Sequence, residues 1–348
     1  MRDYKEHLVE KGSVIKSALA KLNNLAIDAI LFVVDKNNRL LGSLTDGDVR
    51  RGLLKNLNME NKVEEFIQPE PKYVKKGDYS LEYIIKLKSQ NYKIIPVIND
   101  NNEVVNVINF RFLKSYLPFD AVIMAGGKGT RLKPLTDTTP KPLLNVGNKT
   151  IIEHNIDHLR SYGIDDFWIT LNYLGDQIEA KLGEGSDRGI NINYVWENEP
   201  LGTIGAVSKI SVFNHDYVLI INSDVLTTLD YEDFFLDFIS KGADMSVATI
   251  PYSVTIPYAV FETSNHHVVS FKEKPEYTYY SNGGIYLIKK ELLKRISKDK
   301  FYNSTDLMED LISKKDKLIS YPMRQYWLDI GKMEDFKKAQ EDIKHLNF

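Results

Sequence analysis

The sequence contains no cysteine among its 348 residues. Disulfide bridges, thiolate zinc centres and a cysteine nucleophile are therefore excluded. Any metal ion that the protein binds must be held by oxygen or imidazole ligands, which favours a hard ion such as Mg²⁺. The 43% of hydrophobic residues is ample to bury a core, and the length suffices for two domains.

Long apolar runs and basic tracts are also missing. No stretch approaches the roughly 20 apolar residues of a membrane-spanning helix, and the first residues, MRDYKEHL, lack the apolar region of a signal peptide. We therefore expect a cytoplasmic protein with no membrane partner. The formal net charge is -3 and the lysines are spread along the chain, so nucleic acid is not an expected partner either.

The first third of the sequence contains an internal repeat of about 50 residues. A predicted helix over Ser13–Leu22 precedes two strand-like stretches joined by the turn KNNR, and a second helix follows. The same order returns after Ser80, which opens a helix; the turn is then NDNN, and EVVNVINFRFLKSYL is predicted to be a strand and then a helix. We expect a domain over residues 1–117, with repeats of about 8–58 and 62–117.

The segment GSLTDGDVR, Gly42–Arg50, resembles the G-x-x-T-x-x-D element of CBS domains, so the repeat resembles an α+β CBS pair. The resemblance implies that Thr45 and Asp48 contact the phosphate and ribose of an adenine nucleotide, and that the protein forms a homodimer or a higher homo-oligomer. In the second repeat, Asn109 and Phe112 replace these two residues, which predicts a lost ribose contact. Alternatively, Thr45 caps a helix and Asp48 supports it electrostatically.

Strand and helix patterns alternate from residue 118 to residue 348. They predict a second domain of the α/β class with a Rossmann-like, mixed but mostly parallel sheet. Ligands in such sheets bind at the carboxyl ends of the strands. The candidate site is therefore expected where predicted strands end.

One such strand end is followed by MAGGKGTRLKPLTDTTPKPL, Met124–Leu143. Three glycines allow a sharp turn that brings backbone N–H groups to phosphate oxygens, and four cations accompany them. The stretch fits neither G-x-G-x-x-G nor the P-loop, because a third correctly spaced glycine and a Ser or Thr after Lys128 are missing. It predicts a site for a small polyanion such as a nucleotide.

This stretch closely resembles the G-G-x-G-T-R-L-x-P-L-T…P-K-P-L element of the sugar-1-phosphate nucleotidyltransferases. The resemblance implies that the loop binds the nucleoside triphosphate and that Arg131 and Lys141 are catalytic, stabilising the phosphates during transfer. The implied nucleotide-binding residues in the loop are Ala125, Gly126, Gly127, Gly129 and Thr130.

Later segments resemble the same family in the same order. NSDV contributes Asp224, which the resemblance makes catalytic, and YWLDIG contributes Asp329; together these two carboxylates would hold Mg²⁺, whose preferred ligands are oxygens. The sugar side is expected in IPYAVFE, FKEKP and NGGIYLI. The implied sugar-phosphate-binding residues there are Ala259, Glu273, Lys274 and Asn282.

The segment VWENEPLGTIGAV resembles the part of the family that reads the base, and implies nucleotide contacts by Glu197, Gly202 and Thr203. A carboxylate at position 197 can accept two parallel hydrogen bonds from N1–H and N2–H₂ of guanine, whereas uracil and thymine present one donor flanked by acceptors. The sequence therefore predicts GTP as the donor, unless the two glutamates of this segment are only surface charges.

The order of a CBS pair and a transferase resembles the glucosamine-1-phosphate guanylyltransferases of legionaminic acid biosynthesis. Glucosamine 1-phosphate is therefore the predicted acceptor, with mannose 1-phosphate and heptose 1-phosphate as alternatives. An alternative of another class is a non-catalytic protein that senses adenine nucleotides through its CBS half. The presence of Arg131, Lys141 and Asp224 favours the enzyme.

Overall fold

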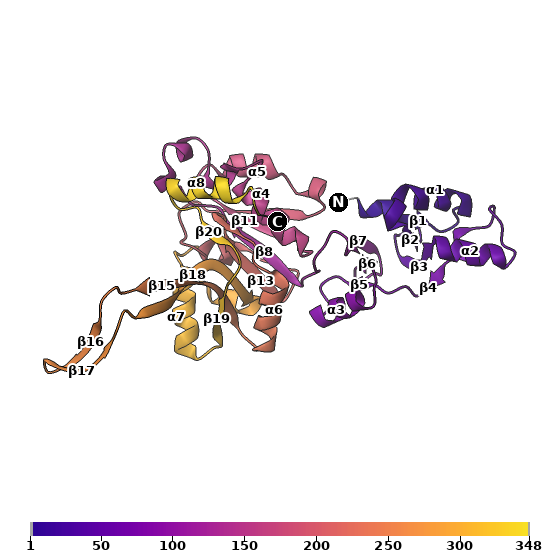
Figure 1. Ribbon diagram of the computed structural model, residues 1–348. Helices are drawn as coiled ribbons and strands as arrows, with labels where there is room; N and C mark the ends of the chain where they lie inside the picture. The colour runs from indigo at the N-terminus through magenta and orange to yellow at the C-terminus, as the bar shows by residue number, and fades with distance from the viewer. Residues whose placement is uncertain (1–2, 347–348) are drawn as a thin grey trace. The chain divides into compact units, whose positions relative to one another are not determined.

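The computed structural model describes residues 3–346, and the chain forms two compact units (Figure 1). The first comprises the residues up to Pro118 together with Arg160–Asp165 and Gly185–Ile190. The second comprises Phe119–Leu159, Asp166–Glu184 and the residues from Asn191 onward.

The first unit holds two small sheets of similar construction. In each, a short strand pairs in parallel with the next strand, which pairs antiparallel with a third, and the antiparallel pairing is irregular near its end. The elements are β1 (Leu8–Glu10), α1 (Ile15–Leu25), β2 (Ile30–Val34), β3 (Leu40–Thr45), α2 (Asp46–Leu54), β4 (Gln68–Pro69), β5 (Val74–Lys75), α3 (Leu81–Ser89), β6 (Ile94–Ile98) and β7 (Val104–Asn109).

The two repeats meet at their turns. Asn38 and Asn102 both adopt a left-handed backbone at φ 60°, which asparagine tolerates better than most residues. The N–H of Leu40 donates to the carbonyl of Asn102 (3.0 Å), and the N–H of Val104 donates to that of Asn38 (2.9 Å).

The helix predicted at the end of the second repeat is absent, which corrects the sequence reading. After β7, Asn109 accepts the N–H of Arg111 through its side chain (3.0 Å) and the N–H of Leu113 through its carbonyl (3.0 Å). These bonds close a turn after the strand, and Pro118 cannot continue a helix. Elsewhere the helices begin near the predicted positions: α3 follows Ser80, whose side chain caps it, whereas α1 ends three residues beyond the predicted Leu22.

The second unit is built on a seven-stranded mixed sheet in the order β12-β11-β8-β13-β18-β15-β19 (Figure 1). The first four strands run parallel, β18 is antiparallel to both its neighbours, and β19 is parallel to β15. The Rossmann-like, mostly parallel fold predicted from the sequence is confirmed. The strands are β8 (Phe119–Met124), β11 (Asp166–Leu171), β12 (Asn191–Trp196), β13 (Tyr217–Asn222), β15 (Met245–Thr255), β18 (Glu276–Lys289) and β19 (Leu318–Pro322).

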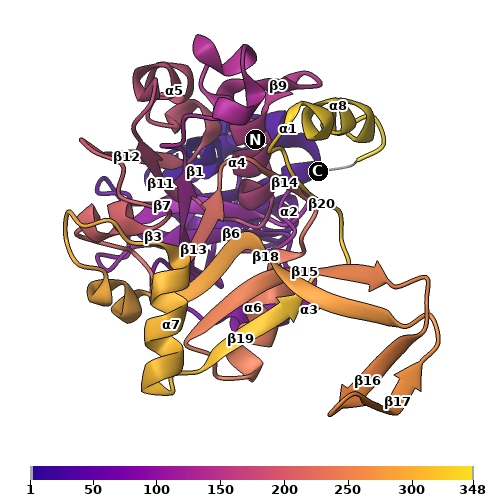
Figure 2. The ribbon, with the colours of Figure 1, turned by 90° about the vertical axis from the view of Figure 1, so that its left-hand side faces the viewer.

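Smaller elements complete this unit. The helices are α4 (Ile151–Ser161), α5 (Gly175–Leu182), α6 (Tyr231–Ser240), α7 (Ser304–Lys314) and α8 (Met333–Asp342), and Gly205–Lys209 form a 3₁₀ turn. Three two-stranded pairs are β9 (Asn145–Val146) with β10 (Lys149–Thr150), β14 (Val225–Thr227) with β20 (Trp327–Asp329), and β16 (Val260–Ser264) with β17 (His267–Lys272). Figure 2 shows β16 and β17 at the far end of the ribbon formed by β15 and β18.

The strand order reverses at β8. From β8 the chain moves to β11 and β12 on one side and then returns to β13 on the other. Such a switch point opens a crevice at the carboxyl ends of the strands, where ligands bind in open α/β sheets. The glycine-rich segment begins at this point, directly after β8.

Candidate active site

The glycine loop follows β8 and leads into a 3₁₀ turn, Thr130–Leu132. Position 129 requires glycine for two reasons. Its φ is +58°, and a Cβ there would lie 3.0 Å from Cβ of Lys141 and 3.1 Å from Cγ2 of Thr136. The side chain of Thr136 donates to the carbonyl of Gly129 (2.9 Å). These contacts hold the loop closely against the segment that carries Lys141.

A cavity of about 420 Å³ opens beside this loop. It is lined by most of the residues that the sequence predicted for the nucleotide and for catalysis: Gly126, Gly127, Gly129, Thr130, Arg131, Lys141, Glu197, Gly202, Thr203 and Asp224. Ala125 is fully buried beneath it, with its N–H donating to the carbonyl of Thr170 (3.1 Å). Residues far apart in sequence thus share one concave surface at the carboxyl ends of the strands.

The sequence reading missed further residues of this cavity. They are Met124, Pro142, Thr170, Pro200, Asn222, Ser223 and Phe301. Asn222 and Ser223 could have been found, because they precede Asp224 at a predicted strand end. Phe301 lies in a loop with no recognisable pattern.

Two carboxylates flank Lys141. Its ammonium lies 2.5 Å from Oδ2 of Asp224 and 3.9 Å from Oδ1 of Asp329. Asp224 follows β13, and Asp329 ends β20; the antiparallel pairing of β14 with β20 sets Asp329 opposite Val225. The N–H of Ile330 also donates to the carbonyl of Asp224 (3.0 Å). Backbone pairing therefore brings the two acidic residues together.

Apolar packing supports the pairing of β14 with β20. Leu226 of β14 and Ile330 after β20 are both fully buried in one cluster, with Leu132 from the glycine loop. On the other side, the guanidinium of Arg131 lies against Gly331, where a Cβ would come within 3.3 Å of its nitrogens. The carboxylates and the two cations are thus held by one packed core.

The acidic pair suits a divalent cation. Oδ1 of Asp224 and Oδ1 of Asp329 are both buried and accept no hydrogen bond, and buried polar atoms are normally satisfied. Burial, followed by the nearby charge of Asp224, raises the pKa of Asp329. Oxygen ligands with excess negative charge are those that Mg²⁺ prefers, so Asp224 and Asp329 fit the metal site predicted from the sequence.

The raised pKa of Asp329 gives a test of this cation site. A carboxyl with a raised folded-state pKa loses its stabilising contribution as the pH rises through that pKa, so ionised Asp329 destabilises the metal-free protein near neutral pH. We expect Asp329→Asn to be at least as stable as the wild type without metal and to lose the gain in Tm on adding Mg²⁺. Differential scanning fluorimetry with and without Mg²⁺ checks both; an equal gain in the two proteins would contradict the site.

Glu197 follows β12 and faces the glycine loop. Its Oε2 accepts the N–H of Leu201 (3.0 Å), and the side chain of Asn172 donates to its carbonyl (2.8 Å). A Cβ on Gly126 would lie 2.9 Å from Oε1, so the absence of a side chain at Gly126 leaves room for this carboxylate. Burial raises the pKa of Glu197.

Gly202 and Thr203 close the same side of the cavity. Gly202 has φ +79°, and a Cβ there would lie 2.7 Å from the carbonyl of Tyr302. The N–H of Thr203 donates to the side chain of Asn303 (3.2 Å), and its hydroxyl accepts the N–H of Ser304 (2.7 Å). The loop is thereby fastened to the start of α7.

The predicted sugar-phosphate residues do not line this cavity. Ala259, Glu273 and Lys274 belong to the hairpin around β16 and β17, and Glu273 and Lys274 are exposed. Asn282 lies in β18, donates to the hydroxyl of Tyr286 (3.0 Å) and accepts the N–H of Gly284 (2.9 Å). Within residues 3–346, none of these four lines the cavity.

In the first unit, Thr45 and Asp48 bond to each other. The hydroxyl of Thr45 donates to Oδ2 of Asp48 (2.5 Å), and the two form a capping box at the start of α2. Arg51 also pairs with Asp48 (2.6 Å). The helix-capping role considered from the sequence is thus present, as expected for this residue pattern.

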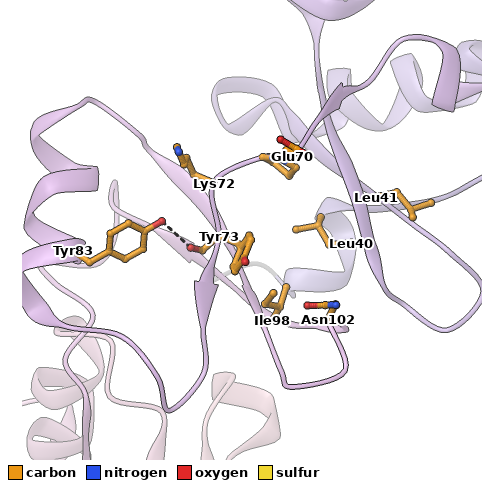
Figure 3. A pocket seen from close by; sticks show the side chains of 9 residues that line it. Leu40, Leu41, Glu70, Lys72, Tyr73, Tyr83, Ile98 and Asn102 are labelled. Atoms are coloured by element: carbon orange, nitrogen blue, oxygen red, sulfur yellow. Dashed lines mark hydrogen bonds between the residues drawn. The ribbon is translucent and has the colours of Figure 1, made fainter.

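The first unit has a cavity of about 620 Å³ that neither Thr45 nor Asp48 lines (Figure 3). Tyr83 and Tyr73 lie at one part of it, and the hydroxyl of Tyr83 donates to the carbonyl of Tyr73 (3.1 Å). Its lining residues are Leu40, Leu41, Glu70, Pro71, Lys72, Tyr73, Tyr83, Ile98 and Asn102. This cavity brings together no cluster of cations or carboxylates comparable with the one around Lys141.

A second acidic cluster lies at the opposite edge of the large sheet. Asp120, Asp166 and His215 are buried, close together, and located where β8, β11 and β13 begin. Asp120 accepts the N–H groups of Asn214 (3.2 Å) and His215 (2.9 Å), and Asp166 accepts from Asn191 (3.0 Å). These bonds anchor strand starts, so we assign the cluster a structural role. The sequence reading had not singled it out.

His154 and His158 are four residues apart on α4, a spacing that can also bind a metal ion. The Nε2 of His154 bonds the carbonyl of Val146 (2.8 Å), and that of His158 bonds the carbonyl of Leu229 (2.9 Å). Both histidines are buried helix-face residues.

Of the helices in residues 3–346, none is both long and apolar enough to cross a membrane.

Known proteins are similar to this chain in sequence. The nucleotidyl transferase family matches residues 120–345, and a CBS domain matches residues 7–55. A D-glycero-alpha-D-manno-heptose 1-phosphate guanylyltransferase of Aneurinibacillus thermoaerophilus is 33% identical over 229 residues, which cover 65% of this chain and 99% of that protein. A mannose-1-phosphate guanyltransferase of Schizosaccharomyces pombe is 32% identical over 225 residues, 62% of each chain.

A solved structure agrees with the fold. HddC from Yersinia pseudotuberculosis, in a crystal structure complexed with GMP-PN, matches with a TM-score of 0.50 and 26% identity, covering 65% of this chain and 99% of that one. The range of the family match, residues 120–345, includes the glycine loop, Asp224 and Asp329. The chain therefore belongs to the nucleotidyl transferase family and carries a CBS domain at its N-terminal end.

Proposed function

We propose that this protein transfers a guanylyl group from GTP to a sugar 1-phosphate, forming a nucleotide sugar and releasing pyrophosphate. The observation that carries the proposal is a cavity lined by the glycine loop, Glu197, Lys141 and Asp224, with Asp329 beside Lys141. The guanylyltransferase relatives support the same reaction.

The reaction needs two anions to be brought together. An oxygen of the sugar phosphate attacks the α-phosphorus of GTP, and pyrophosphate leaves in line with it. No general base is required, because a phosphate monoester is already a nucleophilic anion. The task of the protein is therefore to neutralise, align and hold charged groups.

The residues of the cavity divide this task. Backbone N–H groups of the glycine loop would bind the triphosphate, and Arg131 would spread its planar donors over the departing pyrophosphate. Lys141 neutralises the reacting phosphates. A Mg²⁺ ion held by Asp224 and Asp329 would supply Lewis-acid stabilisation of charge on the phosphate oxygens.

The base preference rests on Glu197. Its half-buried carboxylate lies against the backbone of Gly126 in the glycine loop, where the base of a bound nucleotide can reach it. Guanine offers two parallel donors to such a carboxylate. The names of the relatives support a guanine nucleotide.

The acceptor is proposed within a narrow group. The domain order favours glucosamine 1-phosphate, while the relatives are named for heptose 1-phosphate and mannose 1-phosphate. A pyrophosphate-release panel crossing GTP, ATP, UTP and dTTP with these three sugar phosphates, glucose 1-phosphate and N-acetylglucosamine 1-phosphate tests base and sugar together. We expect release with GTP and one of the first three acceptors; no release from GTP with any acceptor would contradict the proposal.

We also propose that an adenine nucleotide binds the first unit. The CBS match over residues 7–55 supports this proposal. When the nucleotide binds, the hydroxyl of Thr45 would donate to its phosphate instead of to Asp48. We expect AMP or ATP to raise the Tm of the wild type but not of Thr45→Val, in thermal unfolding at matched nucleotide concentration. A nucleotide-induced shift of the same size in both proteins would place the nucleotide elsewhere.

A further inference from the structure

An aromatic side chain lies at the wall of the cavity beside the glycine loop. Phe301, in the loop before α7, lines this cavity, and 64% of the residue is exposed. It is the one aromatic residue among the described residues that line the cavity. Single exposed apolar side chains are common on protein surfaces, so the exposure of Phe301 indicates a function only if the surrounding structure holds it at the cavity.

Hydrogen bonds fix the backbone next to Phe301. The N–H of Tyr302 donates to the carbonyl of Leu201 (2.9 Å), and the N–H of Ile204 donates to the carbonyl of Tyr302 (3.1 Å). Leu201 and Ile204 belong to the segment that follows Glu197. The residue after Phe301 is therefore bonded, through both its N–H and its carbonyl, to the segment that carries the carboxylate proposed to read the base.

Two glycines allow these segments to approach so closely. A Cβ on Gly202 would lie 2.7 Å from the carbonyl oxygen of Tyr302, and a Cβ on Gly205 would lie 2.7 Å from that of Lys300. A side chain at either position would push the loop away from the cavity wall. The backbone on both sides of Phe301 is thus held against the segment that forms this wall.

The neighbouring aromatic side chain packs in the core. Tyr302 is partly buried against the cluster that contains Leu201, Ile204 and Leu307, and burial raises its pKa. Phe301, one residue earlier, lines the cavity instead. Because the core contact of Tyr302 restrains the loop, the backbone at Phe301 loses little conformational freedom when a ligand binds.

Phe301 and Glu197 are positioned for two different parts of a nucleobase. The N–H of Leu201 donates to Oε2 of Glu197 (3.0 Å), while the carbonyl of Leu201 accepts the N–H of Tyr302 (2.9 Å). A single residue therefore connects the carboxylate to the loop of Phe301. Carboxylate oxygens accept hydrogen bonds from the edge of a base, whereas an aromatic ring covers its face.

The other walls of the cavity are mainly polar. Most of the remaining described lining residues are glycines or carry hydroxyl, amide or charged groups. Such groups suit phosphates, ribose hydroxyls and a cation. The apolar face of a purine is better matched by the ring of Phe301.

We propose that the ring of Phe301 stacks on the base of the bound nucleotide, so that Phe301 supplies affinity for a purine while Glu197 selects guanine by its edge. The inference rests on the proposed function and extends it to the base site. Stacking on an aromatic ring does not depend on the hydrogen-bonding groups of the base. Removing the ring should therefore weaken binding without changing the base preference.

Phe301→Ala is expected to raise KM for GTP by about tenfold, the scale of one lost base stack. The value of kcat should stay unchanged, because the stack binds the ground state and the transition state equally. Ile312→Ala is the matched control: Ile312 is also 64% exposed, lies in α7 and does not line the cavity. Equal KM values for GTP in the two variants would overturn the proposal.

Inosine triphosphate (ITP) separates the face of the base from its edge. ITP has the fused rings of GTP but lacks the exocyclic amine. Phe301→Ala should raise KM for both nucleotides by the same factor and keep the ratio of their kcat/KM values, whereas Glu197→Gln should change that ratio. A rise in KM for the sugar phosphate with no rise for GTP would place the ring at the acceptor and contradict the stack.

Phe301→Trp gives a measurement that needs no acceptor. Tryptophan keeps an aromatic face, so this variant should retain the wild-type KM for GTP. Its fluorescence, taken as the difference from the wild type, should be quenched by GTP and not by pyrophosphate. An active wild type whose Phe301→Trp variant shows no quenching by GTP contradicts the stack alone. A wild type that releases no pyrophosphate from GTP with any acceptor contradicts the proposed function, and the fluorescence then still decides whether the base stacks on this residue.

Discussion

Asp224→Asn is expected to lower kcat for nucleotidyl transfer by about 10³-fold, the scale on which preorganised charge stabilisation acts. Asparagine keeps the shape of the side chain but removes its negative charge. The variant thereby loses one of two metal-ligand candidates and the partner that holds Lys141 at 2.5 Å. Steady-state pyrophosphate release at saturating substrates measures the effect.

Asp216→Asn is the matched control for this change. Asp216 is a surface carboxylate, 79% exposed and paired with Lys290, and it lies outside the cavity. We expect this control to keep the wild-type rate and Tm. A rate for Asp224→Asn within a few-fold of the control would show that the carboxylate does not act on the reacting phosphates.

Glu197→Gln is expected to reduce kcat/KM for GTP by about 10–100-fold, the discrimination that a bidentate contact to a base supplies. Glutamine presents one acceptor and one donor, so it cannot accept both N1–H and N2–H₂ of guanine and is better matched to uracil or thymine. The ratio of kcat/KM for GTP to that for UTP should therefore fall. Competition between the two nucleotides measures this ratio directly.

Exposed Glu199, two residues further along the chain, provides the control. Glu199→Gln removes a charge of the same sign without altering the cavity, and its ratio of kcat/KM for GTP to that for UTP should equal that of the wild type.

The pH dependence of KM for GTP gives a second readout. Burial raises the pKa of Glu197, so KM for GTP should rise as the pH falls through that raised pKa, and Glu197→Gln should lack this rise. Parallel pH profiles would refute the base assignment.

The position of the site could be predicted from the sequence because strand ends and glycine loops are local signals. Gly129 lies in a glycine-rich turn and has a left-handed backbone, and Asp224 lies two residues after the end of a buried strand. The glycines and the strand end are both visible in short windows of the sequence. The proximity of Asp224 and Asp329 depends on the pairing of β14 with β20. No local sequence pattern encodes this strand pairing. The pair of Asp224 and Asp329 was therefore predicted only from the family resemblance.

Other features could not be predicted because tertiary contacts decide them. The alternating pattern in residues 251–282 is typical of strands that bury one face. The structure nevertheless leaves both faces of this segment, the outer part of β15 and β18 with β16 and β17, exposed. The segment after β7 has helical spacing, but the bonds to Asn109 close a turn instead. The family resemblance predicted a sugar-phosphate role for Lys274. Only the structure shows that Lys274 belongs to the hairpin around β16 and β17 and does not line the cavity.

The central claim is that Asp224 and Asp329 hold the cation that aligns GTP for attack. Crystals grown with Mn²⁺ and a non-hydrolysable GTP analogue test it most directly through the anomalous scattering of the metal. We predict a peak within coordination distance of both carboxylates and of an α-phosphate oxygen. A peak at Asp120, Asp166 and His215 instead, or a nucleotide bound with no metal at Asp224 and Asp329, would contradict the account.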